Sequence, residues 1–467
     1  MKVIVTGATG FIGRRLVRHL IDGGHTVAAL TRNVAGAKRV LPVRCQALAW
    51  RPGADALDSG ALRGTDVIVH LAGEGVAEAR WSAQRKRAIH DSRVVGTRLL
   101  VDSIATLPAA ERPRALISAS AIGIYGDRRD DSVDEDSGPG SGFLADVCRT
   151  WEAEALRAEA HGLRVAVIRV GIVLGSDGGA LGQMLPPFRL GLGGRLGSGR
   201  QWMSWIHVHD LVRMFRFAIE HDAASGIING VSPEAVINAD FTRELGRALG
   251  RPTLVPVPGV VLQLALGEMA SMLLTGQRVQ AVAARRLDFT YEYPRLQAAL
   301  RDLCSDLTER LEAEQWVPEP PEKVFPFFAD ARNLEQITPA FLHFSVKHVS
   351  TPALQTGTLI DHQLRLHGLP VRWQSRIDRW EPNRAFVDSQ TRGPYALWRH
   401  THEFEPFADG TIIRDRVCYA LPLAPLGSIV AGSLVTRDLQ AIFDFRRAQI
   451  AARFGDDASL AARLRSG

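Results

Sequence analysis

The chain has 467 residues, of which 46% are hydrophobic and 23% charged, so it is too long for one ordinary core and predicts two folded domains. Its formal net charge of +6 is spread along the chain without a basic helix or a basic patch interleaved with aromatic residues, which argues against a nucleic-acid partner. Its four cysteines form no Cys-x-x-Cys pair, which argues against structural zinc, a disulfide framework and an oxidising compartment.

The two most apolar later stretches, residues 262–274 and 421–435, contain Glu268 and two prolines, respectively. Both are shorter than the roughly 20 apolar residues that cross a bilayer, so we expect no membrane span. Met1 leads straight into an apolar run without the features of a signal peptide. We therefore expect a cytoplasmic protein.

The first element is a strand at residues 2–5 that runs into three regularly spaced glycines. Apolar residues then follow helical spacing up to Gly23, and a second strand is expected at residues 26–30. This order predicts a strand, a turn and a helix that bind a dinucleotide, and the alternative is a tight turn without a ligand. The expected contacts in the loop are Gly7, Thr9, Gly10, Phe11, Ile12 and Gly13.

The end of the second strand indicates which dinucleotide is bound. Sites that prefer NAD usually place an acidic residue there, but this strand runs into Thr31-Arg32-Asn33. Arg32 suits the 2′-phosphate of NADP. The alternative is a solvated surface arginine.

Three further apolar runs, at residues 67–71, 115–118 and 165–170, predict central strands of a doubly wound parallel sheet. Ligands bind at the carboxyl ends of such strands, so the segments that follow them are expected to line one cleft. These segments supply four further expected cofactor contacts, Leu71, Ala72, Gly73 and Ser118.

From about Gly178 the sequence becomes rich in glycine and proline and predicts a substrate lobe over residues 178–300. Its expected helices are residues 210–220, 239–249 and 260–274. A charged helical stretch near residues 300–314 then gives way to prolines, so residues 301–320 are expected to form a linker. The expected organisation is therefore residues 1–300, the linker, and a second domain at 321–467.

The second domain has strand-like runs separated by short polar turns and one final helix. A curved antiparallel sheet gripping a long helix, with an apolar pocket inside, explains this α+β order. The expected strands are residues 358–366, 371–380, 385–390, 396–405 and 411–421, and the helix is 436–454.

These residues also carry a resemblance to known families. The first 300 positions resemble the extended short-chain dehydrogenase/reductases, in their atypical epimerase-like branch. Residues 310–455 resemble the START-like, polyketide-cyclase-type (SRPBCC) domains, with Pro320-Pro321-Glu322-Lys323-Val324-Phe325 as the entry motif. Besides the glycine loop, the first resemblance rests on His70-Leu71-Ala72-Gly73-Glu74, Arg80-Trp81, Ser92-Arg93, Ser118-Ala119-Ser120-Ala121, Gly126, Phe143-Leu144-Ala145, Trp151-Glu152, Gly178-Gly179-Ala180-Leu181, Met184-Leu185-Pro186-Pro187-Phe188, Trp205-Ile206-His207 and Gly276-Gln277-Arg278.

The resemblance implies a Tyr-x-x-x-Lys helix that serves hydride transfer, with the tyrosine as acid and base. This chain departs from that pattern, because Phe143 and Val147 stand where the tyrosine and lysine belong. Only five of its 56 basic residues are lysines, and none lies between residues 87 and 322. Of the five tyrosines, only Tyr125 is expected near the cleft.

Three residues are candidates for the missing catalytic function. Ser120 falls where the family's serine polarises a substrate carbonyl, and the alternative is that it only ends a strand. Tyr125 is a second candidate acid, with shaping of the pocket as its alternative. Glu74 ends a strand at the cleft, where burial would raise a carboxyl pKa, and its alternative is a cap or an ion pair.

Candidate substrate contacts lie in two segments. Arg80 and Lys86 form a basic cluster with neighbouring arginines that suits an anionic substrate or the cofactor phosphates, and the alternative is a solvated helix face. Gln201, Trp205 and His207 lie in a segment that resembles the family's substrate-lobe strand. A lone histidine such as His207 also serves as a structural hydrogen-bonding group.

In the second domain, His400 and His402 are expected on one face of a strand with Trp398 and Phe404. Metal binding needs a third ligand that the sequence does not identify, so no metal site is expected. A pocket with polar groups that holds a lipid-like or aromatic ligand is the preferred interpretation.

The sequence thus predicts an NADP-dependent oxidoreductase or epimerase-like enzyme that acts on a small polar or nucleotide-linked substrate. The alternative is a non-catalytic NADP(H)-binding sensor or scaffold coupled to a domain that binds an apolar ligand. A homodimer is an open expectation.

Overall fold

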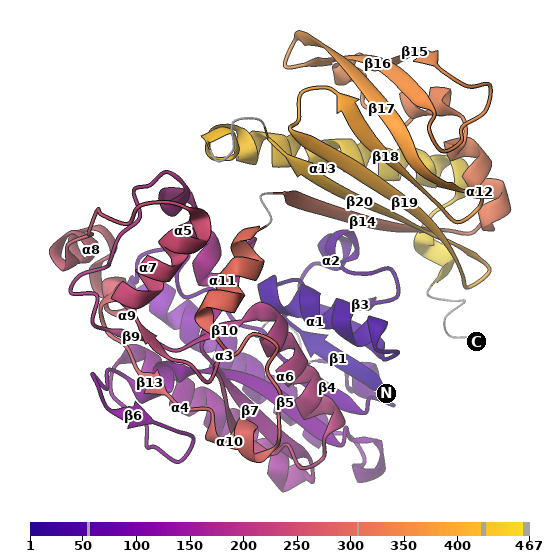
Figure 1. The fold of residues 1–467 in the computed structure, drawn as a ribbon. Coiled ribbons are helices and arrows are strands. Elements are labelled where there is room, and N and C mark those ends of the chain that lie inside the picture. The colour runs from indigo at the N-terminus through magenta and orange to yellow at the C-terminus, as the bar shows by residue number, and fades with distance from the viewer. Residues whose placement is uncertain (54–56, 306–307, 422–425, 461–467) are drawn as a thin grey trace. The chain divides into compact units, whose positions relative to one another are not determined.

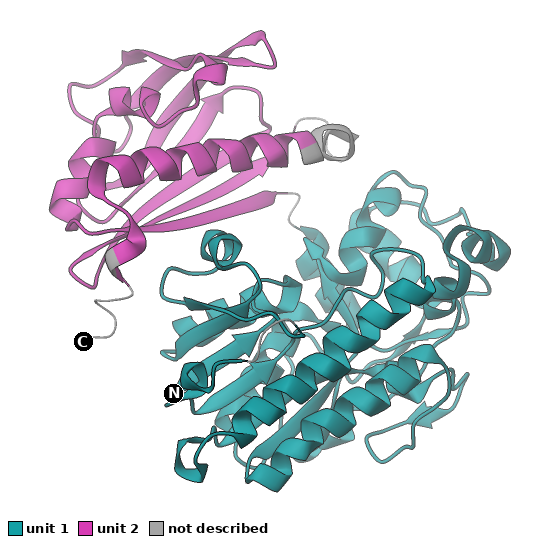
Figure 2. Ribbon diagram, turned by 180° about the vertical axis from the view of Figure 1, so that it is seen from behind, with its two compact units in different colours: residues 1–305 teal, residues 306–467 magenta. Residues whose placement is uncertain are grey.

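The computed structural model describes residues 1–53, 57–305, 308–421 and 426–460, and the chain forms two units, Met1–Ser305 and Asp306–Gly467 (Figures 1 and 2). Within these residues, no helix has both the length and the apolar character needed to cross a membrane. Residues 422–425 of the apolar stretch 421–435 and residues 461–467 of the expected second domain lie outside the described part.

The first unit is built on a seven-stranded sheet with the order β11-β7-β5-β4-β1-β2-β3, in which every neighbouring pair is parallel. The expected doubly wound sheet is confirmed. The edge strands β3 and β11 were not predicted, because they are short and β11 begins and ends with glycine. The strands are β1 Lys2–Thr6, β2 Thr26–Thr31, β3 Gln46–Ala49, β4 Val67–His70, β5 Ala115–Ala121, β7 Arg164–Val170 and β11 Gly226–Gly230.

Helices cover both faces of this sheet, because its strands are apolar on both sides. Val3 and Val5 of β1 join a buried cluster with residues of α1 (Phe11–Asp22) and α6 (Val208–Glu220). Ile4, which points to the opposite face, joins a cluster with residues of α3 (Ala83–Ala105) and α4 (Phe143–Leu156). Figure 2 shows the two long helices of this second face side by side. The shorter α2 (Val34–Val40) follows β2.

The region predicted to form a substrate lobe contains short strands and helices that continue to Ser305. The predicted helix 260–274 is wrong as one element, because Gly267 adopts a φ of +62° and ends α8. The last helix, α11, packs on α7 and buries Leu300, Leu303 and Cys304 in the lobe. The helices are α5 Gly179–Arg189, α7 Asn238–Leu249, α8 Gly259–Leu266, α9 Ser271–Leu274, α10 Val282–Arg286 and α11 Leu296–Ser305. The paired short strands are β8 Ile172–Gly175 with β10 Trp205–His207, β9 Trp202–Met203 with β12 Val236–Ile237, and β6 Ser132–Val133 with β13 Arg278–Val279.

The second unit is a seven-stranded antiparallel sheet, β14-β20-β19-β18-β17-β16-β15, with the long helix α13 packed against it (Figure 2). The expected helix-grip architecture is confirmed, although α13 begins at Leu426 rather than near residue 436. The elements are β14 Glu309–Val317, α12 Pro321–Phe328, β15 Ser345–Val349, β16 Leu359–Leu366, β17 Leu369–Glu381, β18 Ala385–Arg392, β19 Leu397–Phe407, β20 Gly410–Ala420 and α13 Leu426–Phe454.

The expected charged helix at 300–314, and with it the linker at 301–320, differ from the structure. Residues up to Ser305 belong to α11, and β14 pairs along its whole length with β20. Glu314 of β14 is buried against Arg414 of β20, with 2.6 Å between Oε1 and Nε. The arginine that accommodates this glutamate lies about a hundred residues away in the sequence, so local charge density could not reveal the strand.

Candidate functional site

The glycine loop joins β1 to α1 at the carboxyl end of the sheet. Gly7 has a φ of +66°, and a Cβ atom there would lie 2.7 Å from the backbone of Leu71. A Cβ atom at Gly13 would lie 2.2 Å from the carbonyl oxygen of Gly7, so only glycine lets the helix start this close to the loop. Gly10 caps α1 without a side-chain hydrogen bond, so no capping side chain occupies the first-turn N–H groups, which are the groups that bind anions at helix N-termini.

A buried histidine, His70, fixes the neighbouring strand end, a role that its place in the motif His70-Leu71-Ala72-Gly73-Glu74 did not reveal. Thr6 Oγ1 accepts hydrogen bonds from the N–H groups of Leu71 and Ala72, so its own proton is donated to His70 Nδ1, 2.8 Å away. Thr97 donates to the carbonyl oxygen of Arg93 and therefore accepts from His70 Nε2. These partners assign a neutral His70 with its proton on Nε2, and burial lowers its pKa to about 4.

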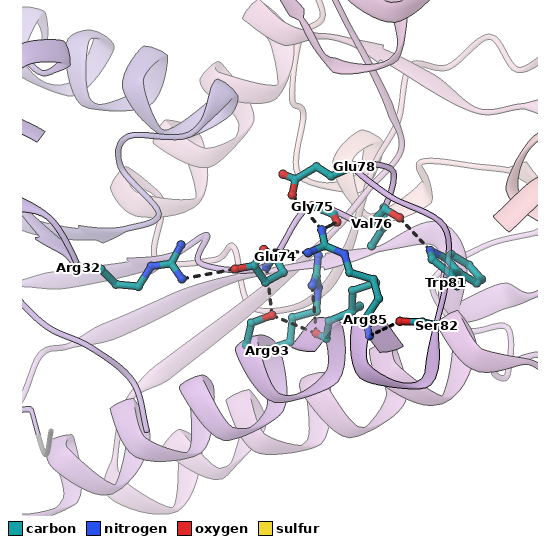
Figure 3. Close-up of polar contacts among 11 residues, drawn as sticks. Arg32, Glu74, Gly75, Val76, Glu78, Trp81, Ser82, Arg85 and Arg93 are labelled. Carbon is teal, nitrogen blue, oxygen red and sulfur yellow. Dashed lines mark hydrogen bonds and ion pairs between the residues drawn. The ribbon is translucent and has the colours of Figure 1, made fainter. Parts of the chain in front are cut away.

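Arg32 and Glu74 form an ion pair (Figure 3). Their strands, β2 and β4, lie on either side of β1, and Arg32 Nη1 is 3.4 Å from Glu74 Oε1. Arg85 lies 3.4 Å from the other carboxylate oxygen of Glu74, so this acid is held between two arginines. The Arg32 side chain is 75% exposed, which leaves it accessible to a phosphate.

A third arginine lies beneath this group. The Arg93 guanidinium would come within 3.0 Å of a Cβ atom on Gly73 and lies 5.2 Å from the ring of Trp151. Burial lowers the pKa of Arg93, and Glu74 counteracts part of this effect. Three arginines, Arg32, Arg85 and Arg93, thus surround the single carboxylate of Glu74.

The segment after β7 also reaches the start of α1. The ring of Phe11 fills the space where Cβ atoms on Gly175 and Gly178 would lie, and Arg15 stacks on that ring at 4.4 Å. Asp177 pairs with Arg14. The structure thus brings together the glycine loop and the predicted ligand segment at 171–175.

Ser120 belongs to a buried polar network. Its hydroxyl donates to Glu152 Oε1 at 2.6 Å, and Arg169 holds both oxygens of Glu152 at 2.9 Å. Ser118 is fully buried, and its hydroxyl donates to the carbonyl oxygen of Ala119. Sequence reasoning missed Arg169 as a site residue, although a charged residue inside the apolar run 165–170 is unusual.

Tyr125 is part of the same network. Its hydroxyl donates to Asn229 Oδ1 at 2.8 Å and accepts from Arg169 Nη1 at 2.9 Å. Burial raises the pKa of Tyr125. The protons of Ser120 and Tyr125 are therefore both donated within the protein, and their catalytic roles stay predictions.

Phe143 and Val147 occupy the first two turns of α4. The ring of Phe143 packs edge-on against Trp81 with centroids 5.2 Å apart, and Lys86 Nζ lies 5.1 Å from the same ring. This lysine also pairs with Glu268. The ring of Phe143 and the ammonium group of Lys86 therefore lie together, but Phe143 lacks the hydroxyl that a tyrosine would supply.

Three other residues predicted to contact the substrate are hydrogen-bonded or buried within the protein. Arg80 donates to the carbonyl oxygens of Leu264 and Ala265, and Gln201 donates to those of Leu196 and Leu273. Trp205 is fully buried. Their assignment to substrate binding stays a prediction.

His207 caps α6. Its Nδ1 accepts from the N–H of His209, its Nε2 lies 3.2 Å from Asp302, and its ring stacks on Tyr293. Burial lowers the pKa of His207. A substrate contact by His207 also stays a prediction.

The second unit contains a half-open cavity of about 170 Å³ between its sheet and helices. Most of its wall is aliphatic or aromatic, whereas His362, Asp388, His400 and His402 form a polar side. Asp388 lies directly opposite His400 in the pairing of β18 with β19, and Asp415 lies opposite His402 on β20. Asp388 is a third potential metal-ligating side chain beside His400 and His402. The sequence alone did not identify it, because only the register of β18 with β19 places it there.

Asp415 faces both histidines from behind the cavity wall. Its Oδ1 atom is hydrogen-bonded to His400 Nε2 at 2.9 Å and lies 2.7 Å from His402 Nδ1. Burial alone would raise the pKa of Asp415, but His402 and His400 hold it well below its usual range. Burial and the neighbouring His402 lower the pKa of His400 to about 4.

Three family models match successive parts of the chain. Residues 3–229 match the NAD dependent epimerase/dehydratase family, and residues 257–303 match a domain of unknown function, DUF1731. Residues 317–445 match the polyketide cyclase / dehydrase and lipid transport family. The last match agrees with the helix-grip fold of the second unit.

Relatives of the first unit are found in plants, animals and bacteria. The chain is 42% identical over 308 residues to the epimerase family protein SDR39U1 homolog, chloroplastic, of Arabidopsis thaliana, which covers 64% of this chain and 86% of that protein. A crystal structure of human epimerase family protein SDR39U1 (isoform2) with NADPH is 35% identical, with a TM-score of 0.59, and covers 65% of this chain and 99% of its own. The nucleoside-diphosphate sugar epimerase from Corynebacterium glutamicum is also 35% identical, with a TM-score of 0.53, and the match covers 65% of this chain and 58% of that one.

Proposed function

Since the chain belongs to the NAD-dependent epimerase/dehydratase family, we propose that its first unit binds NADP(H) at the carboxyl end of β1. The observation that carries this proposal is the cradle at Gly7 and Gly13, which any Cβ atom would fill. First-turn N–H groups of α1 hold the pyrophosphate, and Leu71, Ala72 and Gly73 supply the neighbouring backbone. The crystal structure of the human relative with NADPH supports the same assignment.

Arg32 is the residue that selects NADP(H) over NAD(H). It lies at the end of β2, where the ribose 2′ position is read in this type of fold. In the structure it is 3.4 Å from Glu74, a separation typical of a weak, exposed pair. We propose that its guanidinium turns from this carboxylate to the 2′-phosphate when the nucleotide binds.

We further propose an oxidoreductase or epimerase-like activity on a small polar or nucleotide-linked substrate. Bound NADP(H) supplies hydride chemistry. The hydroxyl of Ser120 moves a proton between the substrate oxygen and Glu152, which lies 2.6 Å away and is held by Arg169. Arg80 and Lys86 border the substrate in this proposal. Arg80 contacts α8, and Lys86 lies over the ring of Phe143, which stands at the position of the family's tyrosine.

A second candidate function is that of a non-catalytic NADP(H)-binding sensor. The observation that favours it is the network in which Ser120 and Tyr125 both donate their protons internally, together with Phe143 at the position of the usual tyrosine. A sensor needs the nucleotide site but no free proton donor.

Turnover measurements separate the two candidates. The purified chain is examined for co-purified nucleotide, and NADPH absorbance is followed over a panel of carbonyl compounds and nucleotide sugars. Turnover that is lost in Ser120→Ala but retained in Ser103→Ala, a helix serine that bonds only to a backbone carbonyl, supports the enzyme. Tight NADPH binding without turnover on any compound supports the sensor.

For the second unit, we propose that the cavity binds an apolar small molecule. Its aliphatic and aromatic wall supports this proposal, as does the match to the polyketide cyclase and lipid transport family. Trp373 and Trp398 border the cavity, whose volume of about 170 Å³ suits a molecule of benzene or short-chain size. Hexanoate should therefore change tryptophan fluorescence with saturation. An unchanged signal in the wild type would contradict this proposal.

A cytoplasmic location and a homodimer remain expectations from the sequence, and sedimentation velocity tests the homodimer.

A further inference from the structure

The polar side of the cavity in the second unit has the geometry of a metal site. One ligand atom from each of Asp388, His400 and His402 lies within 4.8 Å of the others. Asp388 Oδ1 is 3.4 Å from His402 Nε2 and 4.0 Å from His400 Nδ1. Ligand atoms bound at about 2.1 Å in a tetrahedral arrangement are separated by about 3.4 Å. These separations are too long for good hydrogen bonds but suit a shared ion.

The remaining nitrogen of each imidazole lies close to Asp415. His400 Nε2 is hydrogen-bonded to Asp415 Oδ1 at 2.9 Å, and His402 Nδ1 lies 2.7 Å from the same oxygen without forming a hydrogen bond. Histidines that bind a metal commonly direct their other ring nitrogen at a carboxylate, which fixes the tautomer and the ring orientation. Here one carboxylate serves both rings, because it lies opposite His402 on the next strand. Arg446 Nη1 lies 3.6 Å from Asp415 Oδ1, so its positive charge offsets the negative charge that Asp415 brings to this cluster.

The arrangement also leaves room for further ligands. His362, Asp388, His400 and His402 line the cavity, whereas Asp415 does not. His362 is 7% exposed, and its Nδ1 has no hydrogen-bonding partner. Three protein ligands with an open position toward a cavity are typical of reactive or ligand-binding zinc sites rather than closed structural ones.

We propose that Asp388, His400 and His402 bind one divalent transition-metal ion, with Zn²⁺ as the best fit, and that Asp415 positions the two imidazoles. Two nitrogens and one carboxylate oxygen are the ligand types that Zn²⁺ accepts. The open coordination position faces the cavity, so the ion would bind an oxygen-bearing head group of an otherwise apolar molecule. This site is independent of the nucleotide site of the first unit.

Cobalt substitution tests the proposal on the full chain. After treatment with a chelator, Co²⁺ is added and the visible spectrum is recorded. We expect one Co²⁺ per chain with the strong visible bands of a four-coordinate ion, and displacement of the ion by Zn²⁺. Absence of a saturable spectrum in the wild type would overturn the proposal, as would a thiolate-to-cobalt charge-transfer band that places the ion on a cysteine.

Variants then identify the ligands. Asp388→Asn keeps the side-chain volume. Loss of a carboxylate that only orients a metal ligand weakens metal binding about 10–100-fold, so loss of the ligand Asp388 itself should weaken Co²⁺ binding by at least this factor. Asp415→Asn should weaken binding by about 10–100-fold while one ion still binds, with shifted visible bands. His367→Gln is the matched control, because this histidine is 57% exposed and pairs with Asp438. Equal Co²⁺ affinity of Asp388→Asn and the wild type would overturn the proposal. If a variant fails to fold, the visible spectrum of the Co²⁺-loaded wild type still tests whether the site exists.

Discussion

At the scale of single residues, the proposed nucleotide site has the Glu74 carboxylate between two arginines. This carboxylate lies 3.4 Å from both Arg32 and Arg85, so under our proposal it competes with the 2′-phosphate for Arg32. Glu74→Gln should therefore strengthen NADPH binding about 1.4- to fivefold, as expected for an exposed pair worth about 0.2–1 kcal/mol, and leave NADH binding unchanged.

Fluorescence titration with both nucleotides measures this effect. Glu78→Gln is the matched control, since Glu78 pairs with Arg85 but not with Arg32. Weaker NADPH binding by Glu74→Gln would show that the carboxylate supports the nucleotide rather than competing with its phosphate.

His70 makes the stability of the first unit depend on pH. Its pKa is about 4 in the folded chain and about 6.5 in the unfolded chain. Between these values the unfolded chain binds the additional proton, so the free energy of unfolding should fall as pH decreases from about 6.5 to 4, by about 1.4 kcal/mol per pH unit at most. The loss should be complete near pH 4.

Urea unfolding at several pH values checks this dependence. His70→Gln should give a shallower slope over the same window, whereas His90→Gln, an exposed histidine on α3, should keep the wild-type slope. Identical slopes for the wild type and His70→Gln would contradict the assignment of a neutral, buried His70.

At the scale of elements, the β1–α1 turn leaves no space for a side chain at Gly13. A methyl group at Gly13 would lie 2.2 Å from the Gly7 carbonyl oxygen and 2.7 Å from Ala8 Cα, and backbone atoms cannot move aside. Gly13→Ala should lower the free energy of unfolding by about 1–3 kcal/mol and weaken NADPH binding more than tenfold. Gly138→Ala is the control, because nothing lies within 4 Å of its added Cβ atom. NADPH binding at wild-type strength by Gly13→Ala would contradict the proposed cradle.

The elements also show what the sequence could and could not predict. Periodicity located β1, β4, β5, β7 and most strands of the second sheet, because their apolar runs are local signals. It missed β14, whose Glu314 is accommodated by Arg414 from a distant strand. It likewise missed Asp388, because only the register of β18 with β19 places this carboxylate opposite His400. The glycine loop and Arg32 were accessible from sequence, since their constraint lies within a single turn and a single strand end.

At the scale of the whole molecule, the two units have separate cores. Each described hydrophobic cluster takes its residues from one unit only, with Val3 and Leu300 in clusters of the first unit and Phe325 and Tyr419 in clusters of the second. Residues 1–305 and 306–467, expressed separately, should therefore each unfold cooperatively. Thermal unfolding followed by circular dichroism tests this, and a fragment without a cooperative transition would contradict the division at Ser305.

The central claim is that the first unit binds NADP(H) and that Arg32 recognises the 2′-phosphate. The most direct test is equilibrium titration of the wild type, Arg32→Ala and Arg63→Ala with NADPH and with NADH. Arg63 is a suitable control, because it is similarly exposed, pairs with Glu111 and precedes the amino end of β4, whereas Arg32 follows the carboxyl end of β2. The wild type should prefer NADPH, and Arg32→Ala alone should lose about 1.5–3 kcal/mol of NADPH binding, roughly ten- to 150-fold, with NADH binding unchanged. Equal affinity of the wild type for both nucleotides, or unchanged NADPH binding by Arg32→Ala, would contradict the claim.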